Sequence, residues 1–368
     1  MASDSHGGSM RDPIRYAPDI ERPEAEEEQT ERLLCRALTE ILDTTSGNYG
    51  HAVRAVHAKS HGIFEARFEI LPDLPPELAQ GLFARPGRHP ALVRISTNPG
   101  DLLPDSVSVP RGLALKILEV EGERLARAEG DTQDFVMVNG PAFAAPDAAS
   151  FLKSLNRLAR TTDQATWAKV ALSSVLRGAE KVLEAAGGES ATLKTMGGAP
   201  NVHPLGESYF SQTAFRHGDF IAKYQLVPVS DSLTRLTGEE IPAAGAPDAL
   251  RERVAQDLAE GGVWEFRVQL CRNAETMPVE DPSRIWSEEE SPFVTVARLT
   301  APPQPGWSEA RAEAVDDPIR FSVWTGLAAH RPLGAINRVR QATYRLSSDY
   351  RAAFNRCPIH EPDRVDLP

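Results

Sequence analysis

Cysteine is scarce in this chain and offers no disulfide framework. The 368 residues contain three cysteines, Cys35, Cys271 and Cys357, which lie far apart and form no CxxC pair. An odd number of separated cysteines suits a reducing compartment better than a set of disulfides. We therefore expect a cytoplasmic protein.

Long apolar runs and basic clusters are also missing. No apolar run approaches the roughly 18 residues of a membrane span, and the N-terminus lacks the apolar segment of a signal peptide. The net charge is −12, and no stripe of Lys and Arg offers the surface that phosphate backbones require. The expected partners therefore include neither nucleic acid nor a membrane.

The common catalytic and metal motifs are absent. The sequence has no HExxH, no Walker GxxxxGK[ST], no GxGxxG after a strand and no GxSxG elbow. His57 and His61 stand four residues apart and would share one face of a helix. Gly62 and the strand pattern after it argue against a helix there, and no third ligand is evident. The sequence therefore assigns no metal ligands.

The chain is organised as a polar arm followed by one large domain. Residues 1–22 are polar, acidic and proline-bearing, and we expect a disordered leader and arm. Residues 23–368 are expected to form a single domain, because large barrels with added helices reach this size. Apolar residues at helical spacing predict helices at 24–42, within an insertion at about 147–187, at 247–259 and at about 335–355.

Alternating apolar and polar residues predict strands between these helices. Phe64, Ala66, Phe68 and Ile70 alternate with charged residues, as in a half-buried strand. Further strands are expected at 91–98, 112–118, 134–138, 208–215, 219–227, 263–271 and 293–299. Their number and spacing favour a closed or nearly closed antiparallel barrel.

Several motifs, in the same order and at similar spacing, resemble those of the haem catalases, specifically the short members of that family. Arg54-Ala-Val-His57-Ala-Lys59 resembles Arg-x-Val-His-Ala-Lys, and Val93-Arg94-Ile-Ser96-Thr97 resembles Val-Arg-Phe-Ser-Thr. The segment 105–116 resembles a third motif, Asp-Thr-x-x-Asp-Pro-Arg-Gly-Phe-Ala-Val-Lys. The resemblance implies an α+β fold with a catalase-like antiparallel β-barrel and appended α-helices.

The resemblance also implies a haem pocket. His57 matches the distal histidine that moves a proton during peroxide cleavage, and Ser96 matches the serine bonded to it. The remaining matches are implied cofactor contacts. They are the propionate-binding arginines Arg54, Arg94 and Arg331, the valine above the iron, Val56, and the aromatic walls Phe143 and Phe151.

The distal side departs from the family pattern. The first of the family's two adjacent asparagines helps to polarise peroxide, and its place falls on Val138. Asn139 matches the second, and either turns into the pocket as a catalytic residue or serves as a turn residue before proline. Ala144 replaces a second pocket phenylalanine, so a substrate larger than hydrogen peroxide can be accommodated.

The proximal side departs further. The family has Arg-x-x-x-Tyr, whose tyrosinate binds the iron. Counting back from His330-Arg331-Pro-Leu-Gly334, Arg320 keeps the arginine and Trp324 takes the tyrosine's place. An indole has no free lone pair for a metal. Three outcomes remain open: haem held by another residue, of which His330 and Tyr344 are nearest in sequence; haem without a protein ligand; or no haem. Tyr344 is expected to pack within the terminal helix.

The sequence thus supports two functional hypotheses. The first is a catalase-like haem protein that oxidises or reduces a small peroxide or organic hydroperoxide, with weak or absent true catalase activity. The alternative is a catalase-fold binding protein that has lost haem and enzymatic activity. A homo-oligomer and a monomer are both compatible with the sequence.

Overall fold

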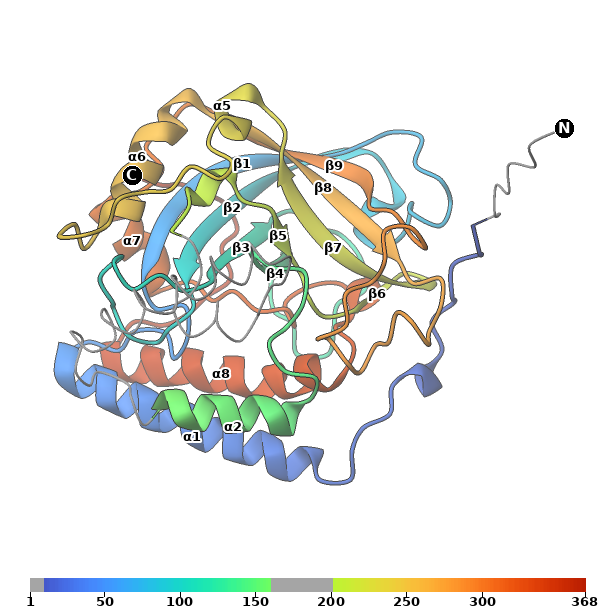
Figure 1. Cartoon of the computed structure of the whole chain (residues 1–368), viewed down its shortest axis with the longest axis horizontal. Coiled ribbons are helices and arrows are strands. Elements are labelled where there is room, and N and C mark those ends of the chain that lie inside the picture. Colours follow the sequence, from blue (N-terminus) through green and yellow to red (C-terminus); the bar gives the residue numbers. More distant parts are fainter. Residues whose placement is uncertain (1–9, 160–200) are drawn as a thin grey trace, which may run out of the picture.

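The computed structural model describes residues 10–159 and 201–368. A β-barrel occupies the centre, and helices α1, α2 and α8 form a layer along one side of it (Figure 1). The helices are α1 (Glu27–Tyr49), α2 (Ala148–Ala159), α5 (Asp231–Thr234), α6 (Ala249–Asp257), α7 (Glu309–Asp316) and α8 (Ala335–Asn355). No helix in these two ranges is both long and apolar enough to cross a membrane.

Eight antiparallel strands close the barrel. Their order is β5-β4-β3-β2-β1-β9-β8-β7, and pairing of β5 with β7 closes the ring, while β6 adds to β7. The strands are β1 (Ser60–Ile70), β2 (Gly87–Thr97), β3 (Arg111–Ile117), β4 (Gln133–Val138), β5 (Tyr209–Phe210), β6 (Phe215–His217), β7 (Phe220–Pro228), β8 (Gly262–Leu270) and β9 (Val294–Ala301). The expected α+β fold with an antiparallel barrel is confirmed.

Strand alternation decides which side chains fill the barrel and which face outward. On β2, Val93 and Ile95 belong to the main apolar core, whereas Arg94 and Ser96 take the opposite face, as successive strand residues must. The interior also holds aromatic rings in contact, such as Phe135 and Phe266 at 4.8 Å between centroids. The outer face of β2 and β3 is therefore available to carry a site beneath the helical layer.

The helical layer rests on the apolar stripe that the sequence shows. In α1, the buried residues are Thr30, Leu34, Ala37, Leu38, Ile41, Leu42, Thr45 and Ser46. The apolar members of this stripe share a core cluster with Ala335 and Val339 of α8 and with Leu155 of α2. Gly50 ends α1 with φ 66°, a left-handed cap that glycine adopts without a Cβ penalty.

The arm after residue 10 lies along the barrel. Ile14, Tyr16 and Ile20 pack against a core cluster near β7 and β8, and the Ile14 N–H donates to Cys271 O at 2.8 Å. Apolar contacts and a backbone hydrogen bond thus join this segment to the barrel. Residues 1–9 lie outside the described residues.

Other elements also differ from the sequence-based expectations. The expected strand 208–215 is two short strands, because Gln212 has φ 60° and breaks the extended backbone. Helix α7 was not expected. Of the expected insertion 147–187, the structure describes α2, and residues 160–187 lie outside the described part. Helix α8 coincides with the expected C-terminal helix.

Candidate functional site

His57 lies on the outer face of the barrel, at the turn that enters β1. Its φ of 57° is rare for a residue with a Cβ, and its N–H donates to Asn98 O at 2.7 Å. The ring Nδ1 is 3.1 Å from Ser96 Oγ. Across from the ring is Gly112, where an added Cβ would lie 2.5 Å from His57 Cε1. The missing side chain at Gly112 therefore makes room for the imidazole.

The surroundings of His57 favour a neutral ring. Burial, followed by the charges of Arg94, Arg340 and Arg54, lowers the pKa of His57 to about 3. A neutral imidazole keeps one nitrogen with a free lone pair. At neutral pH His57 is therefore neutral, with one ring nitrogen free to accept a hydrogen bond.

Three arginines converge on one short segment, residues 315–319, beside His57. Arg94 donates through Nε to Asp316 Oδ1 at 2.6 Å and also to His57 O and Ala58 O. Arg54 donates to Ile319 O at 2.9 Å, with its Nε 3.9 Å from Asp316 Oδ1. Arg351 donates to Asp316 O. Three guanidinium groups thus gather around the carboxylates of Asp316 and Asp317, which are fewer than the positive charges.

The excess of positive charge shows in the pKa values and in spare donors. Burial raises the pKa of Asp316, but the charges of Arg94 and Arg54 outweigh it and leave the pKa below its usual value. Burial, then the charges of Arg351 and Arg94, lower the pKa of Arg54. The Nε atoms of Arg54 and Arg351 are buried and have no hydrogen-bond partner among the described residues. These donors fit an added anionic group such as a carboxylate.

One face of α8 is turned toward His57 and the barrel. Asn337 contacts Thr213 and Ala214 O, and Ser347 Oγ accepts from Ala55 N–H at 3.2 Å. The charge of Arg340 acts on His57. Tyr344 follows Arg340 by four positions and precedes Ser347 by three, so it lies on this same face.

The Tyr344 hydroxyl has no hydrogen-bond partner within residues 10–159 and 201–368, and its side chain is half-buried. From the sequence we expected Tyr344 to pack within the terminal helix. A second Arg-x-x-x-Tyr pattern, Arg340-Gln-Ala-Thr-Tyr344, lies inside that helix. Counting back from His330-Arg331 instead places the Arg-x-x-x-Tyr pattern earlier in the chain, at Arg320 and Trp324.

Aromatic side chains line the region between α2 and α8. The rings of Phe143 and Phe151 are 5.2 Å apart between centroids, and the Arg340 guanidinium carbon lies 5.5 Å from the centre of the Phe143 ring. Val56 and Phe151 pack against the cluster that joins α1, α2 and α8. The structure thus brings Val56, Phe143 and Phe151 to the helical side of the His57 site.

Asn139 points away from His57. Its Oδ1 accepts from Arg111 N–H at 2.8 Å, and its Nδ2 donates to Glu207 Oε1 at 2.6 Å. Val138 instead shares a row with Gly112 and Ser96 across β4, β3 and β2. The position that faces the site therefore carries an apolar side chain, and the catalytic assignment of Asn139 lacks a contact with the other site residues.

The proximal residues proposed from the sequence are engaged elsewhere. Trp324 Nε1 donates to Asn337 O at 2.7 Å, which fixes the indole against α8. Arg320 pairs with Glu361 and Glu129, neither of which contacts another predicted site residue. Arg320 and Trp324 therefore do not form a pair directed at His57.

His330 and Arg331 also lie apart from His57. His330 is buried in the barrel core, where its Nε2 accepts from Leu82 N–H at 2.9 Å and its Nδ1 is 3.1 Å from Tyr224 Oη. Arg331 pairs with Glu21 of the arm and donates to Tyr16 Oη. Both ring nitrogens of His330 are used, so it has no free atom for a metal in this arrangement.

Comparison with solved structures shows that this barrel with its helices has the catalase fold. A fungal catalase matches with a TM-score of 0.57 and 18% identity, over 89% of this chain and 67% of that chain. Catalase A from Saccharomyces cerevisiae matches with a TM-score of 0.59 and 17% identity, over 89% and 69%. No family model and no curated protein sequence matches the chain. Identities this low show the shared fold alone.

Proposed function

We propose that this chain is a haem-dependent oxidoreductase that acts on a small peroxide or organic hydroperoxide, with weak or absent disproportionation of hydrogen peroxide. One observation carries the proposal: a neutral histidine held by Ser96 lies beneath the α8 face that bears Tyr344, beside arginines with unused donors. The catalase fold supports it.

The donor set of this site fits haem. The unpartnered Nε atoms of Arg54 and Arg351 would donate to the propionates. Tyr344 would supply a phenolate oxygen to the iron, a ligand that Trp324 cannot replace, because an indole nitrogen offers only a donor. When bound, haem supplies the redox-active iron.

The side chains around His57 define what the protein itself would contribute. His57 would accept the hydroperoxide proton at its free ring nitrogen and return it to the departing oxygen. Val138, in the row with Ser96 and Gly112, offers no amide to polarise the second oxygen. An apolar wall instead favours a substrate with an alkyl group, which is why we propose an organic hydroperoxide as substrate.

Haem retention tests the proposal and the ligand together. The full chain, loaded with haem and desalted, should keep a Soret band at close to one haem per protein. Tyr344→Phe should lose most of that haem, whereas Trp324→Phe should keep it, because only the phenol is proposed to reach the iron. Haem per protein and the absorption spectrum are the measurements.

Each outcome has a distinct meaning. A colourless wild-type protein would reject the proposal and leave the alternative, a catalase-fold binding protein without haem or enzymatic activity. Haem lost from Trp324→Phe but retained by Tyr344→Phe would reject the ligand assignment. Circular dichroism of both variants separates loss of haem from loss of fold.

A further inference from the structure

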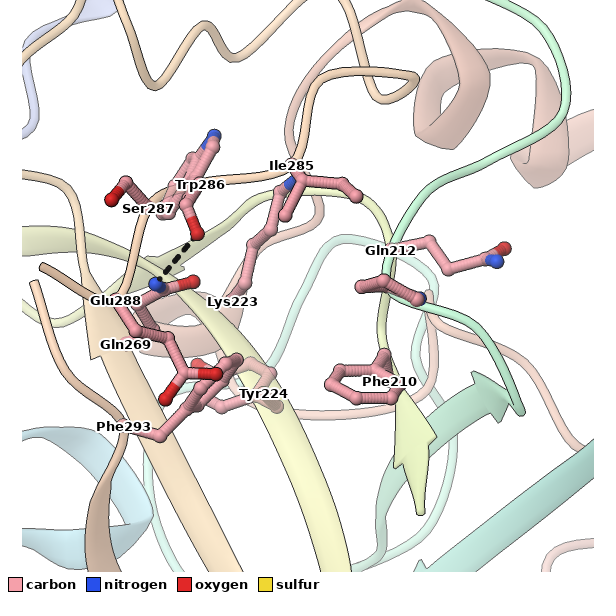
Figure 2. Close-up of a pocket in the computed structure, with 11 residues that line it drawn as sticks. Phe210, Gln212, Lys223, Tyr224, Gln269, Ile285, Trp286, Ser287, Glu288 and Phe293 are labelled. Atoms are coloured by element: carbon pink, nitrogen blue, oxygen red, sulfur yellow. Dashed lines mark hydrogen bonds between the residues drawn. The ribbon is translucent and has the colours of Figure 1, made fainter. Parts of the chain in front are cut away.

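A cavity of about 310 Å³ lies on the outer face of β5, β7 and β8, under the loop around residues 285–293. Figure 2 shows the side chains of Phe210 and Phe293 on one side of it, with Lys223 extending toward Ile285. The lining residues are Pro141, Phe210, Gln212, Lys223, Tyr224, Gln269, Ile285, Trp286, Ser287, Glu288 and Phe293. This volume is within the range of small-molecule sites.

Lys223 is a buried cation in this cavity, and no described residue forms an ion pair with it. It is 4% exposed, and strand pairing places it opposite Gln269. Its Nζ donates to Arg284 O at 3.1 Å and lies 4.9 Å from the centre of the Trp286 ring. Among residues 10–159 and 201–368, no carboxylate lies within ion-pair distance of Lys223.

The acidic groups near Lys223 do not neutralise it. Asp281 Oδ1 accepts from the N–H and hydroxyl of Ser283, and Glu288 is exposed at the loop. Burial lowers the pKa of Lys223 to about 8, against the opposing effects of Asp281 and Cys271. A buried ammonium without a paired charge is costly, and a bound anion would offset that cost.

Part of the cavity wall is apolar and would pack against an apolar body on that anion. The rings of Phe210 and Phe293 are 6.2 Å apart between centroids. Ile285 is 61% exposed beside Lys223, which leaves apolar surface in reach of a ligand. A small hydrophilic anion would pair with Lys223 but would leave these walls uncovered.

We propose that this cavity binds an amphiphilic monocarboxylate, with the carboxylate on Lys223 Nζ and the hydrocarbon chain against Phe210 and Phe293. The site is separate from the His57 site. Its ligand contacts none of the residues proposed to hold haem, so it stands or falls independently of the proposed oxidoreductase function.

Calorimetric titration of the full polypeptide chain with octanoate tests this site. Octanol, which has a hydrocarbon chain of the same length but no charge, is the comparison. Octanoate should bind in a saturable way, at least about tenfold more tightly than octanol, because a charge-assisted bond is lost with the carboxylate. Lys223→Met should remove this preference, and Lys223→Arg should retain part of it.

The control is Lys153→Met, which removes an exposed lysine of α2 and should leave octanoate binding unchanged. Binding should weaken as the pH rises well above 8, where the ammonium of Lys223 is lost. Equal affinity for octanoate and octanol, or unchanged octanoate binding by a folded Lys223→Met variant, would overturn the proposal. Circular dichroism establishes that each variant is folded.

Discussion

At the scale of single residues, His57 is fixed by contacts that a chemical role would need. Ser96 holds Nδ1, Gly112 leaves room for the ring, and the backbone adopts a left-handed conformation that costs energy for a residue with a side chain. Strain that neighbouring contacts maintain is common at functional sites. The proposed role in proton transfer gives these features a reason.

Replacing His57 tests that role. In haem-loaded protein, His57→Gln should lower hydroperoxide turnover by about 10²- to 10⁴-fold, the usual contribution of a general acid–base. The wild-type rate should not fall through protonation of His57 between pH 5 and 8, because the pKa of His57 is lowered to about 3. Steady-state rates at several pH values are the measurement.

His51→Gln is the matched control, since His51 has a side chain 48% exposed and pairs with Asp317 at the surface. It should keep full turnover. Equal rates for His57→Gln and wild type, with haem retained in both, would remove His57 from the mechanism.

At the scale of elements, Arg338 of α8 joins three separate parts of the chain. Its guanidinium pairs with Glu21 of the arm, Glu27 of α1 and Glu280 of the loop after β8. Burial lowers the pKa of Arg338, but the hydrogen bonds that it donates to Glu27, Glu280 and Glu21 outweigh burial and raise the pKa above its usual value. Arg338 thus fixes the arm and the helical layer to one another.

Removing this guanidinium should loosen both contacts. We expect Arg338→Met to lower the free energy of unfolding by about 2–4 kcal/mol, because three carboxylates lose their shared partner. The arm should also become more sensitive to limited proteolysis. Denaturant unfolding and the rate of arm cleavage are the measurements.

Arg345 supplies a control on the same helix. Its side chain is 62% exposed and pairs with Asp349 one turn away, so Arg345→Met should change stability by no more than about 0.5 kcal/mol. If both variants have the same stability, the Arg338 cluster does not hold these elements together.

At the scale of the whole molecule, buried histidines set the response to acid. His61, His217 and His330 are fully buried. Burial lowers the pKa of His217 to about 4 and the pKa values of His61 and His330 well below 6.5. In the unfolded chain these groups return to about 6.5 and bind protons that the folded protein excludes.

The protein should therefore lose stability as the pH falls below about 6.5, by about 2 kcal/mol for each of these histidines at pH 5. Well above pH 6.5 these histidines are neutral in both the folded and the unfolded state, so they no longer lower the free energy of unfolding. Unfolding by denaturant at pH 7, 6 and 5 measures the change, and a midpoint that stays constant across these values would contradict it. His217→Gln should reduce the pH dependence.

Local patterns in the sequence were enough to predict the barrel and most of its helices. Alternation gave the strands, and the stripe of Leu34, Leu38, Ile41 and Leu42 gave α1, because burial on one face imposes a period on each element. The strand break at Gln212 and the docked arm were not predicted. Both depend on contacts between residues far apart in the chain.

The motifs that resemble those of the haem catalases predicted from the sequence that His57, Ser96 and Arg94 belong together, and the structure places His57 Nδ1 3.1 Å from Ser96 Oγ and lets Arg94 donate to His57 O. Only the tertiary structure decided which other groups reach them. It turned Asn139 toward Glu207 and Val138 toward the site, fixed Trp324 on Asn337 O, and placed Tyr344 on the α8 face above His57. Side-chain direction at a loop or on a helix depends on packing partners distant in sequence, and no local pattern contains that information.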